Sequence, residues 1–190
     1  MPTFEFVLAF TSVISALGIG HLLAGAVQLL RRASHVRFSL VQALWMWSAL
    51  AITLGNWASD WELHEQTQWP AWTLLLLIVS NIAQYVFCHF VTPEAPAGEI
   101  DLRQFHAREG NRYMWAMVVL AFIALAFNFA FGGADLYGPW VRDSVLVIIA
   151  IFLGLLAIFV KAQWVQLGVA LSFAVLETYF LVAASTLGTT

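Results

Sequence analysis

The chain has 190 residues, of which 62% are hydrophobic and only 10% are charged, and its mean hydropathy is +0.84. Soluble domains average about 45–50% apolar and about 25% charged residues, so this composition indicates a protein whose solvent is lipid. A formal net charge of −3 gives no reason to expect a nucleic-acid partner. The single cysteine, Cys88, excludes an intrachain disulfide and a metal site built from cysteines.

Six apolar runs follow one another along the chain, each near the roughly 20 residues that a membrane-spanning helix needs. They cover residues 4–30, 38–57, 69–91, 113–131, 140–160 and 162–187. The pattern predicts an all-α integral membrane protein, with residues 1–190 forming a single domain of six transmembrane helices. Segment 99–112 carries Leu102 and Phe105 on one side and charged residues on the other, which predicts one short cytoplasmic interfacial helix.

Basic residues mark alternate gaps between the runs. Only Arg142 lies elsewhere. The other seven lie in the gaps after runs one, three and five: Arg31, Arg32, Arg37, Arg103, Arg108, Arg112 and Lys161. Lys and Arg remain on the cytoplasmic side of short loops, so these three gaps are expected inside and both termini outside. The N-terminus lacks the basic region of a cleaved signal peptide, so we expect the first helix to insert with its N-terminus outside.

Polar side chains at membrane depth are costly and usually face the interior of a helix bundle. At 1.5 Å per residue, His21, Asn81 and Gln84 would lie roughly 10–16 Å from the inner surface. Asn128 and Glu177 would lie at roughly 24 Å, beyond them. The sequence therefore predicts a polar track through the bundle, formed by Glu5, His21, Asn81, Gln84, Asn128 and Glu177.

A histidine and a glutamate at this depth suit a proton relay or a cation site, because both change charge when the environment shifts their proton affinity. Interhelical hydrogen bonding is the competing interpretation. It is favoured for Asn81, Gln84 and Asn128, and weighs equally for His21. A functional role is favoured only for Glu177, since a carboxyl at that depth must be neutral, paired or hydrated; Glu5 is expected to be solvated.

Small residues recur every fourth position in the first run, at Ser12, Ala16, Gly20 and Ala24. Such a stripe lets two helix backbones approach closely, so it predicts the helix-packing face of this helix. It also motivates the alternative that the protein packs against a second copy or another membrane protein.

No recognised catalytic, phosphate-binding or haem-attachment motif occurs, so the sequence favours no enzyme and predicts no catalytic residue, cofactor or metal. The estimated depths of His21 and His89 differ by roughly 13 Å, which disfavours a haem held between them. The outer segment that contains Asp60, Glu62, His64 and Glu65 is expected to be a solvated acidic loop rather than a divalent-cation site.

Several short stretches resemble a group of small bacterial membrane proteins of uncharacterised function. They are Phe4-Glu5-Phe6, Gly18-Ile19-Gly20-His21-Leu22-Leu23, Arg31-Arg32, Asp101-Leu102-Arg103 and Asn111-Arg112-Tyr113-Met114-Trp115. The resemblance implies a six-helix protein of the bacterial inner membrane and carries over no activity and no site residue.

The leading functional hypothesis is a transporter, channel or membrane sensor that uses the polar track. The rival is a non-catalytic subunit or scaffold of a larger membrane complex. An integral-membrane enzyme ranks third. The lipid bilayer is the one partner that the sequence predicts directly.

Overall fold

The computed structural model describes residues 3–65, 69–94, 99–132 and 139–186. Over these residues the chain forms six α-helices: α1 (Thr3–Arg31), α2 (Leu40–Ser59), α3 (Ala71–Val91), α4 (Leu102–Gly132), α5 (Pro139–Phe159) and α6 (Gln163–Thr186). Two 3₁₀ helices, η1 (Ala33–His35) and η2 (Asp60–Glu65), and two-residue strands, β1 (Val36–Arg37) and β2 (Ile100–Asp101), complete the described elements. The helical fold class is confirmed, and five of the six apolar runs match a helix to within two residues at each end.

Four of these helices are long and apolar enough to cross a membrane: Phe4–Arg31, Ala71–Val91, Leu102–Ala130 and Gln163–Ala184. The apolar part of α5, Ser144–Phe159, is shorter. Helix α2 is not among these four, and its buried face includes the polar residues Gln42, Ser48 and Thr53. Four apolar helices of this length suggest a protein that is embedded in a membrane.

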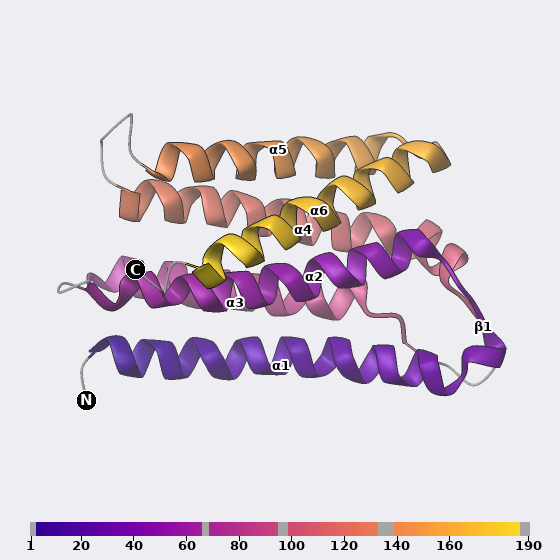
Figure 1. Ribbon diagram of the computed structural model, residues 1–190, viewed down its shortest axis with the longest axis horizontal. Coiled ribbons are helices and arrows are strands. Elements are labelled where there is room, and N and C mark those ends of the chain that lie inside the picture. Colours follow the sequence, from indigo (N-terminus) through magenta and orange to yellow (C-terminus); the bar gives the residue numbers. More distant parts are fainter. Residues whose placement is uncertain (1–2, 66–68, 95–98, 133–138, 187–190) are drawn as a thin grey trace.

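Figure 1 shows the helices lying side by side, with α1 at one edge of the bundle and α5 at the other. Helix α6 begins beside the end of α5 and runs obliquely until it packs against α2. The three gaps that carry the basic residues meet at one end, which we call the basic end. There β1 pairs in parallel with β2, and the Lys161 ammonium contacts the Asn111 side chain. Helix α1 begins and α6 finishes at the opposite end, the terminal end.

The prediction of a separate interfacial helix in segment 99–112 is wrong. Helix α4 begins at Leu102 and continues without a break to Gly132. Its start is fixed by Asp101, whose Oδ1 accepts hydrogen bonds from the backbone N–H groups of Arg103 (2.9 Å) and Gln104 (3.1 Å). That cap satisfies two of the free donors at the helix start. No proline interrupts the helix afterwards, so the polar first turns and the apolar run form one continuous helix.

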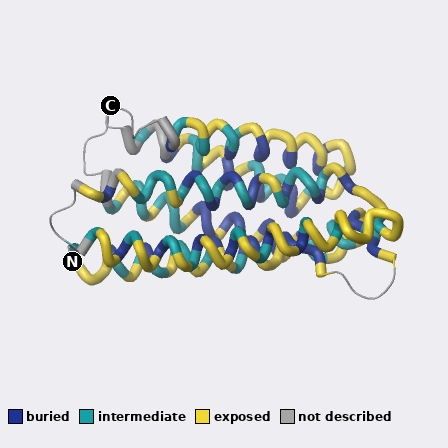
Figure 2. The backbone as a smooth tube through the Cα atoms, turned by 60° about the horizontal axis from the view of Figure 1, so that its bottom comes forward, coloured by how far each residue is buried: buried dark blue, intermediate teal, exposed yellow. Residues whose placement is uncertain are grey.

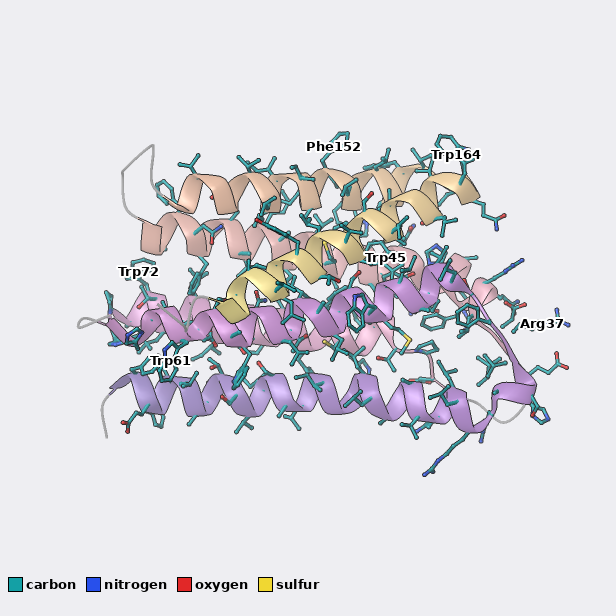
Figure 3. All side chains as sticks on the ribbon, viewed as in Figure 1. Arg37, Trp45, Trp61, Trp72, Phe152 and Trp164 are labelled. Atoms are coloured by element: carbon teal, nitrogen blue, oxygen red, sulfur yellow. The ribbon has the colours of Figure 1, made fainter. Side chains whose placement is uncertain are left out.

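Exposed residues lie around the outside of the bundle (Figure 2), and many of them are large and apolar. Phe152 on α5 is 65% exposed and Trp164 on α6 is 78% exposed, and Figure 3 shows both pointing away from the neighbouring helices. Exposed apolar patches on this scale are unfavourable in water, and lipid would cover them without cost. The polar side chains in the middle of the helices lie mainly on the inward faces.

Helix α1 packs through a different face from the predicted one. Ala16, Gly20 and Ala24 are exposed, and nothing lies within 4 Å of a Cβ placed on Gly20. Ser12 accepts a 2.9 Å hydrogen bond from Trp57 Nε1 on α2. The buried face of α1 is the adjoining one, and it consists of Thr11, Ser15, Gly18, Leu22 and Gly25. A Cβ on Gly25 would approach Thr92 Cγ2 to 2.2 Å, so α1 and the end of α3 require glycine there.

Candidate functional site

A cavity of about 540 Å³ occupies the half of the bundle toward the terminal end. Every one of the six helices contributes to its wall, from Ser15 on α1 to Ala184 on α6. The contributing segments are the later turns of α2, α4 and α6 and the earlier turns of α5. The cavity forms there because α6 leaves α5 and crosses to α2, so that the two helices diverge toward the terminal end (Figure 1).

Polar side chains from six elements line this cavity. They are Ser15 on α1, Asn56 and Ser59 on α2, Asp60 at the start of η2, Ser80, Asn81 and Gln84 on α3, Asn128 on α4 and Glu177 on α6. Four members of the predicted polar track, Asn81, Gln84, Asn128 and Glu177, therefore surround one space. The alignment of Asn128 with Ala121 and Ala124 explains its position, since both alanines line the same wall.

Some of these groups are joined by hydrogen bonds across helices. Asn56 Nδ2 donates to Gln84 Oε1 at 2.5 Å, which ties α2 to α3. Asn81 donates to the backbone oxygen of Leu77 (3.0 Å) and accepts from the Ser15 hydroxyl (3.5 Å). Some of the hydrogen bonds that the side-chain amides of α3 can make therefore hold helices together, which agrees with the interpretation of these residues as interhelical hydrogen-bonding groups.

Glu177 differs from these amides. Its residue is only 7% exposed, and no described side chain or backbone group hydrogen-bonds to its carboxyl or forms an ion pair with it. Asn128, on α4, also has no hydrogen-bond partner among the described residues. Buried polar groups are nearly always satisfied, and an exception requires a specific explanation such as a bound water, ion or ligand. These two side chains supply unused hydrogen-bonding capacity to the cavity.

Asp60 stands at the outer rim of the cavity, where α2 gives way to η2. Burial raises the pKa of its carboxyl from 3.8 to about 6, and a hydrogen bond from the Thr11 hydroxyl opposes part of that rise. The expectation of a fully solvated acidic loop is therefore wrong for Asp60, although the side chains of Glu62 and Glu65 lie outside the described residues. His64 is exposed and its ring stacks on Trp61 at a centroid distance of 5.6 Å.

A layer of packed aromatic side chains closes the cavity toward the basic end. We call it the aromatic plug, formed by Trp45, Phe87, Tyr113 and Phe173, each at most 1% exposed. The Trp45 ring lies 5.0 Å from the Phe173 ring and 5.6 Å from the Tyr113 ring between centroids. Figure 3 shows Trp45 near the middle of the bundle. No cavity lining residue lies on the far side of this layer, so the cavity has one closed end.

Beyond the plug, a hydrogen-bond network joins five helices. Gln42 donates to the backbone oxygen of Val91 (2.6 Å) and accepts from the Tyr113 hydroxyl (3.3 Å). The Tyr113 hydroxyl also contacts His106, whose other ring nitrogen lies 3.1 Å from Gln166 Oε1. The Gln166 amide then donates to the carbonyl of Ala157 near the end of α5 (2.7 Å) and to that of Val160, the residue after α5 (2.6 Å). Each of these side chains has a partner within the network, and its bonds to backbone carbonyls tie neighbouring helices together, which indicates a structural role.

His21 and Glu5, the other two members of the predicted track, do not line the cavity. Glu5 is exposed in the first turn of α1. His21 lies against His89 on α3 with 4.7 Å between ring centroids, so the estimated difference of roughly 13 Å in depth is wrong. The depth estimate is wrong because α1 extends beyond the end of α3. Gly25 on α1 is level with Thr92 at the end of α3, and Arg31 and Arg32, from which the depth of His21 was counted, lie beyond that level.

The described residues contain no group of three or more His, Cys, Asp or Glu side chains close enough to hold a metal ion. Among the described residues, the cavity lining contains no histidine or cysteine and no lysine or arginine. What the arrangement can do chemically is accept hydrogen bonds and offset positive charge, through two carboxyls, four carboxamides and several hydroxyls.

Sequence reasoning missed Asp60, Asn56 and Ser80 as cavity residues. Asn56 shares a helix face with Ala49 and Thr53, so the small-residue criterion that selected Asn128 would also have selected it. Asp60 is recognisable only from the position of η2 against α1, for which the sequence has no local signal.

No protein-family model matches the chain, and no curated protein or solved structure is significantly similar to it.

Proposed function

We propose that this protein is a membrane transporter that binds a small solute in the cavity. The observation that carries the proposal is the buried, unpartnered Glu177, which lines the same space of about 540 Å³ as Asn128 and all six helices. Ionisable residues at membrane depth usually mark substrate or ion pathways. An unpartnered carboxyl costs stability, so its presence in a well-packed bundle favours a functional role.

The aromatic plug favours a transporter over a permanently open channel. A transporter exposes its site to one side of the membrane at a time, and a cavity with one closed end fits one such state. A sensor would use the same cavity to bind without moving its ligand. In this proposal all six helices span the membrane, and the basic end faces the cytoplasm by the positive-inside rule. The location would be the bacterial inner membrane, as the sequence resemblance implies.

The first experiment tests whether the cavity is hydrated. In a Cys88→Ala background, Asn81→Cys on the cavity wall should react with a membrane-impermeant thiol reagent. The matched control is Ile82→Cys, the next residue of α3, which is 50% exposed on the outer surface where lipid would cover it. The proposal expects fast modification at position 81 and little at 82. Absence of reaction at position 81 would contradict it.

Orientation and flux complete the test. Ala107→Cys at the basic end should resist an impermeant reagent applied to intact cells, whereas Trp61→Cys at the terminal end should react. Liposomes that contain the protein should then move at least one of four probes: protons, Na⁺, K⁺ or phenethylammonium. Glu177→Gln should reduce that movement. Binding without movement would indicate a sensor, and co-purification of a stoichiometric membrane partner without binding would favour the non-catalytic subunit.

A further inference from the structure

We propose that the ligand of the cavity is an organic cation, which places a protonated amino group against Glu177 and an apolar body against the wall beyond it. This inference rests on the proposed function and specifies its substrate class. Three independent properties of the cavity lead to it: its charge, its size and its wall.

The charge of the lining has one sign. Asp60 and Glu177 are the titratable groups among the lining residues, and no basic side chain that the structure describes lines the cavity with them. An anionic ligand would meet two carboxyls without a compensating cation. A cation at Glu177 would instead supply the missing counter-charge in a low-dielectric site, where opposite charges attract strongly. The free amide of Asn128 adds an acceptor oxygen for a second N–H group.

The two carboxyls lie at different depths. Gly55 on α2 is level with Phe180 on α6, since a Cβ on Gly55 would come within 2.6 Å of the phenyl ring. Counting 1.5 Å per residue from that level places Asp60 about 12 Å nearer the terminal end than Glu177. Asp60 can therefore attract a cation at the rim, and Glu177 can hold it at the closed end. Both helices contribute these groups from fixed turns rather than from a flexible loop.

The size of the cavity argues against a bare metal ion. One water molecule needs about 10–15 Å³ of cavity volume, whereas small organic ligands occupy pockets of about 300–1,000 Å³. The observed 540 Å³ falls in the second range. A divalent ion would also need several charged ligands around one point, and the described residues contain no such group.

The wall supplies surface for an apolar body. Besides the polar groups it presents apolar side chains that include Leu77, Leu120, Val147, Leu176 and Phe180. Trp57 stands at the rim, where its indole could attract a passing cation through its π face. A mixed lining of this kind fits an amphipathic amine better than a fully hydrated inorganic ion.

The test measures charge preference at a reporter inside the cavity. Asn81→Cys, with Ser80→Cys as a second reporter, is treated with a trimethylammonium-ethyl and a sulfonato-ethyl methanethiosulfonate, two reagents of similar size and opposite charge. At each reporter, the rate of modification by the cationic reagent is divided by the rate for the anionic reagent. The same rate ratio at Trp61→Cys, on the exposed surface, corrects for the intrinsic reactivity of the two reagents. The inference expects the cationic reagent to be favoured by roughly tenfold. Glu177→Gln should abolish most of that preference, and Asp60→Asn a smaller part.

Ligand protection separates the amine from its neutral analogue. Phenethylammonium should slow modification of the reporters, and 2-phenylethanol at the same concentration should not. If the reporters react without charge preference, or if the alcohol protects as well as the amine, the cavity is hydrated but its ligand is not an organic cation. If neither reporter reacts with either reagent, the cavity is dry and the proposed function fails with it.

Discussion

Both halves of the bundle contain buried polar side chains, and the halves differ in how fully these side chains are bonded. Toward the basic end, Gln42 and Gln166 are buried and their amides are bonded to backbone carbonyls. Toward the terminal end, Glu177 is almost equally buried and has no partner among the described residues. A buried polar residue therefore indicates a site only when its hydrogen-bonding capacity is unused.

The boundary between the halves is the aromatic plug, and it contains one exception. Trp45 is completely buried, and its indole N–H has no hydrogen-bond partner. The other polar groups around it, Tyr113 and Gln42, are bonded. The packing of the ring against Phe173 and Tyr113 must outweigh the cost of that one unsatisfied donor.

The largest effect is expected for Trp45→Ala. Removing a fully buried Trp from a packed layer leaves a cavity, and such changes cost about 3–5 kcal/mol of unfolding free energy. The matched change in the other half is Trp57→Ala, a side chain that is 47% exposed at the cavity rim and should cost much less. Thermal unfolding of the purified protein in detergent measures both. Equal losses would mean that the two halves are packed alike.

The second prediction concerns Gln42→Leu on the basic side of the plug. Leucine fills similar space but leaves the Val91 carbonyl without its donor and the Tyr113 hydroxyl without its acceptor. An unsatisfied buried group costs about 1–3 kcal/mol, so the melting temperature should fall. Gln163→Leu, at an exposed position at the start of α6, is the control for adding an apolar side chain. A neutral outcome at position 42 would show that the network is not structural.

The helices of this protein are predictable from its sequence, while the level of one helix against another is not. Apolar length alone locates five of the six helices closely. It cannot show that α1 extends past α3, which brings His21 to His89 and away from the cavity. The packing face of α1 fails for a related reason. A stripe of small residues permits close approach, but the contacts of Gly18 and Gly25 with α3 decide which side is used.

The sequence predicts cavity residues best where a polar side chain at membrane depth shares a helix face with small residues. Asn128 and Glu177 met that condition, and both line the cavity. Asp60 did not, because it follows a helix end, and its burial depends on tertiary packing of η2 against α1. A sequence pattern along one helix carries no information about such a contact.

The third prediction is a gain of stability, whereas the second is a loss. Glu177→Leu should raise the free energy of unfolding by about 1 kcal/mol, since it removes a buried carboxyl that has no partner. It should also abolish ligand binding in the cavity, as expected when stability and function compete. Glu177→Gln, which keeps the shape, should change stability less. A clear loss of stability in the leucine variant would show that Glu177 has the same structural role as Gln42.

The smallest expected effect is a pH dependence that originates at Asp60. Its pKa is raised from 3.8 to about 6 in the folded protein, so the folded state binds this proton more tightly than the unfolded state does. The stability that this proton contributes is fully present below about pH 4 and is lost as the pH rises through about 6. The melting temperature, measured in a Glu177→Gln background so that only one carboxyl of the cavity titrates, should therefore decline slightly over that interval. Asp60→Asn should remove the decline. Its persistence in the asparagine variant would assign the titration to another group and leave the rim of the cavity without a pH-sensitive charge.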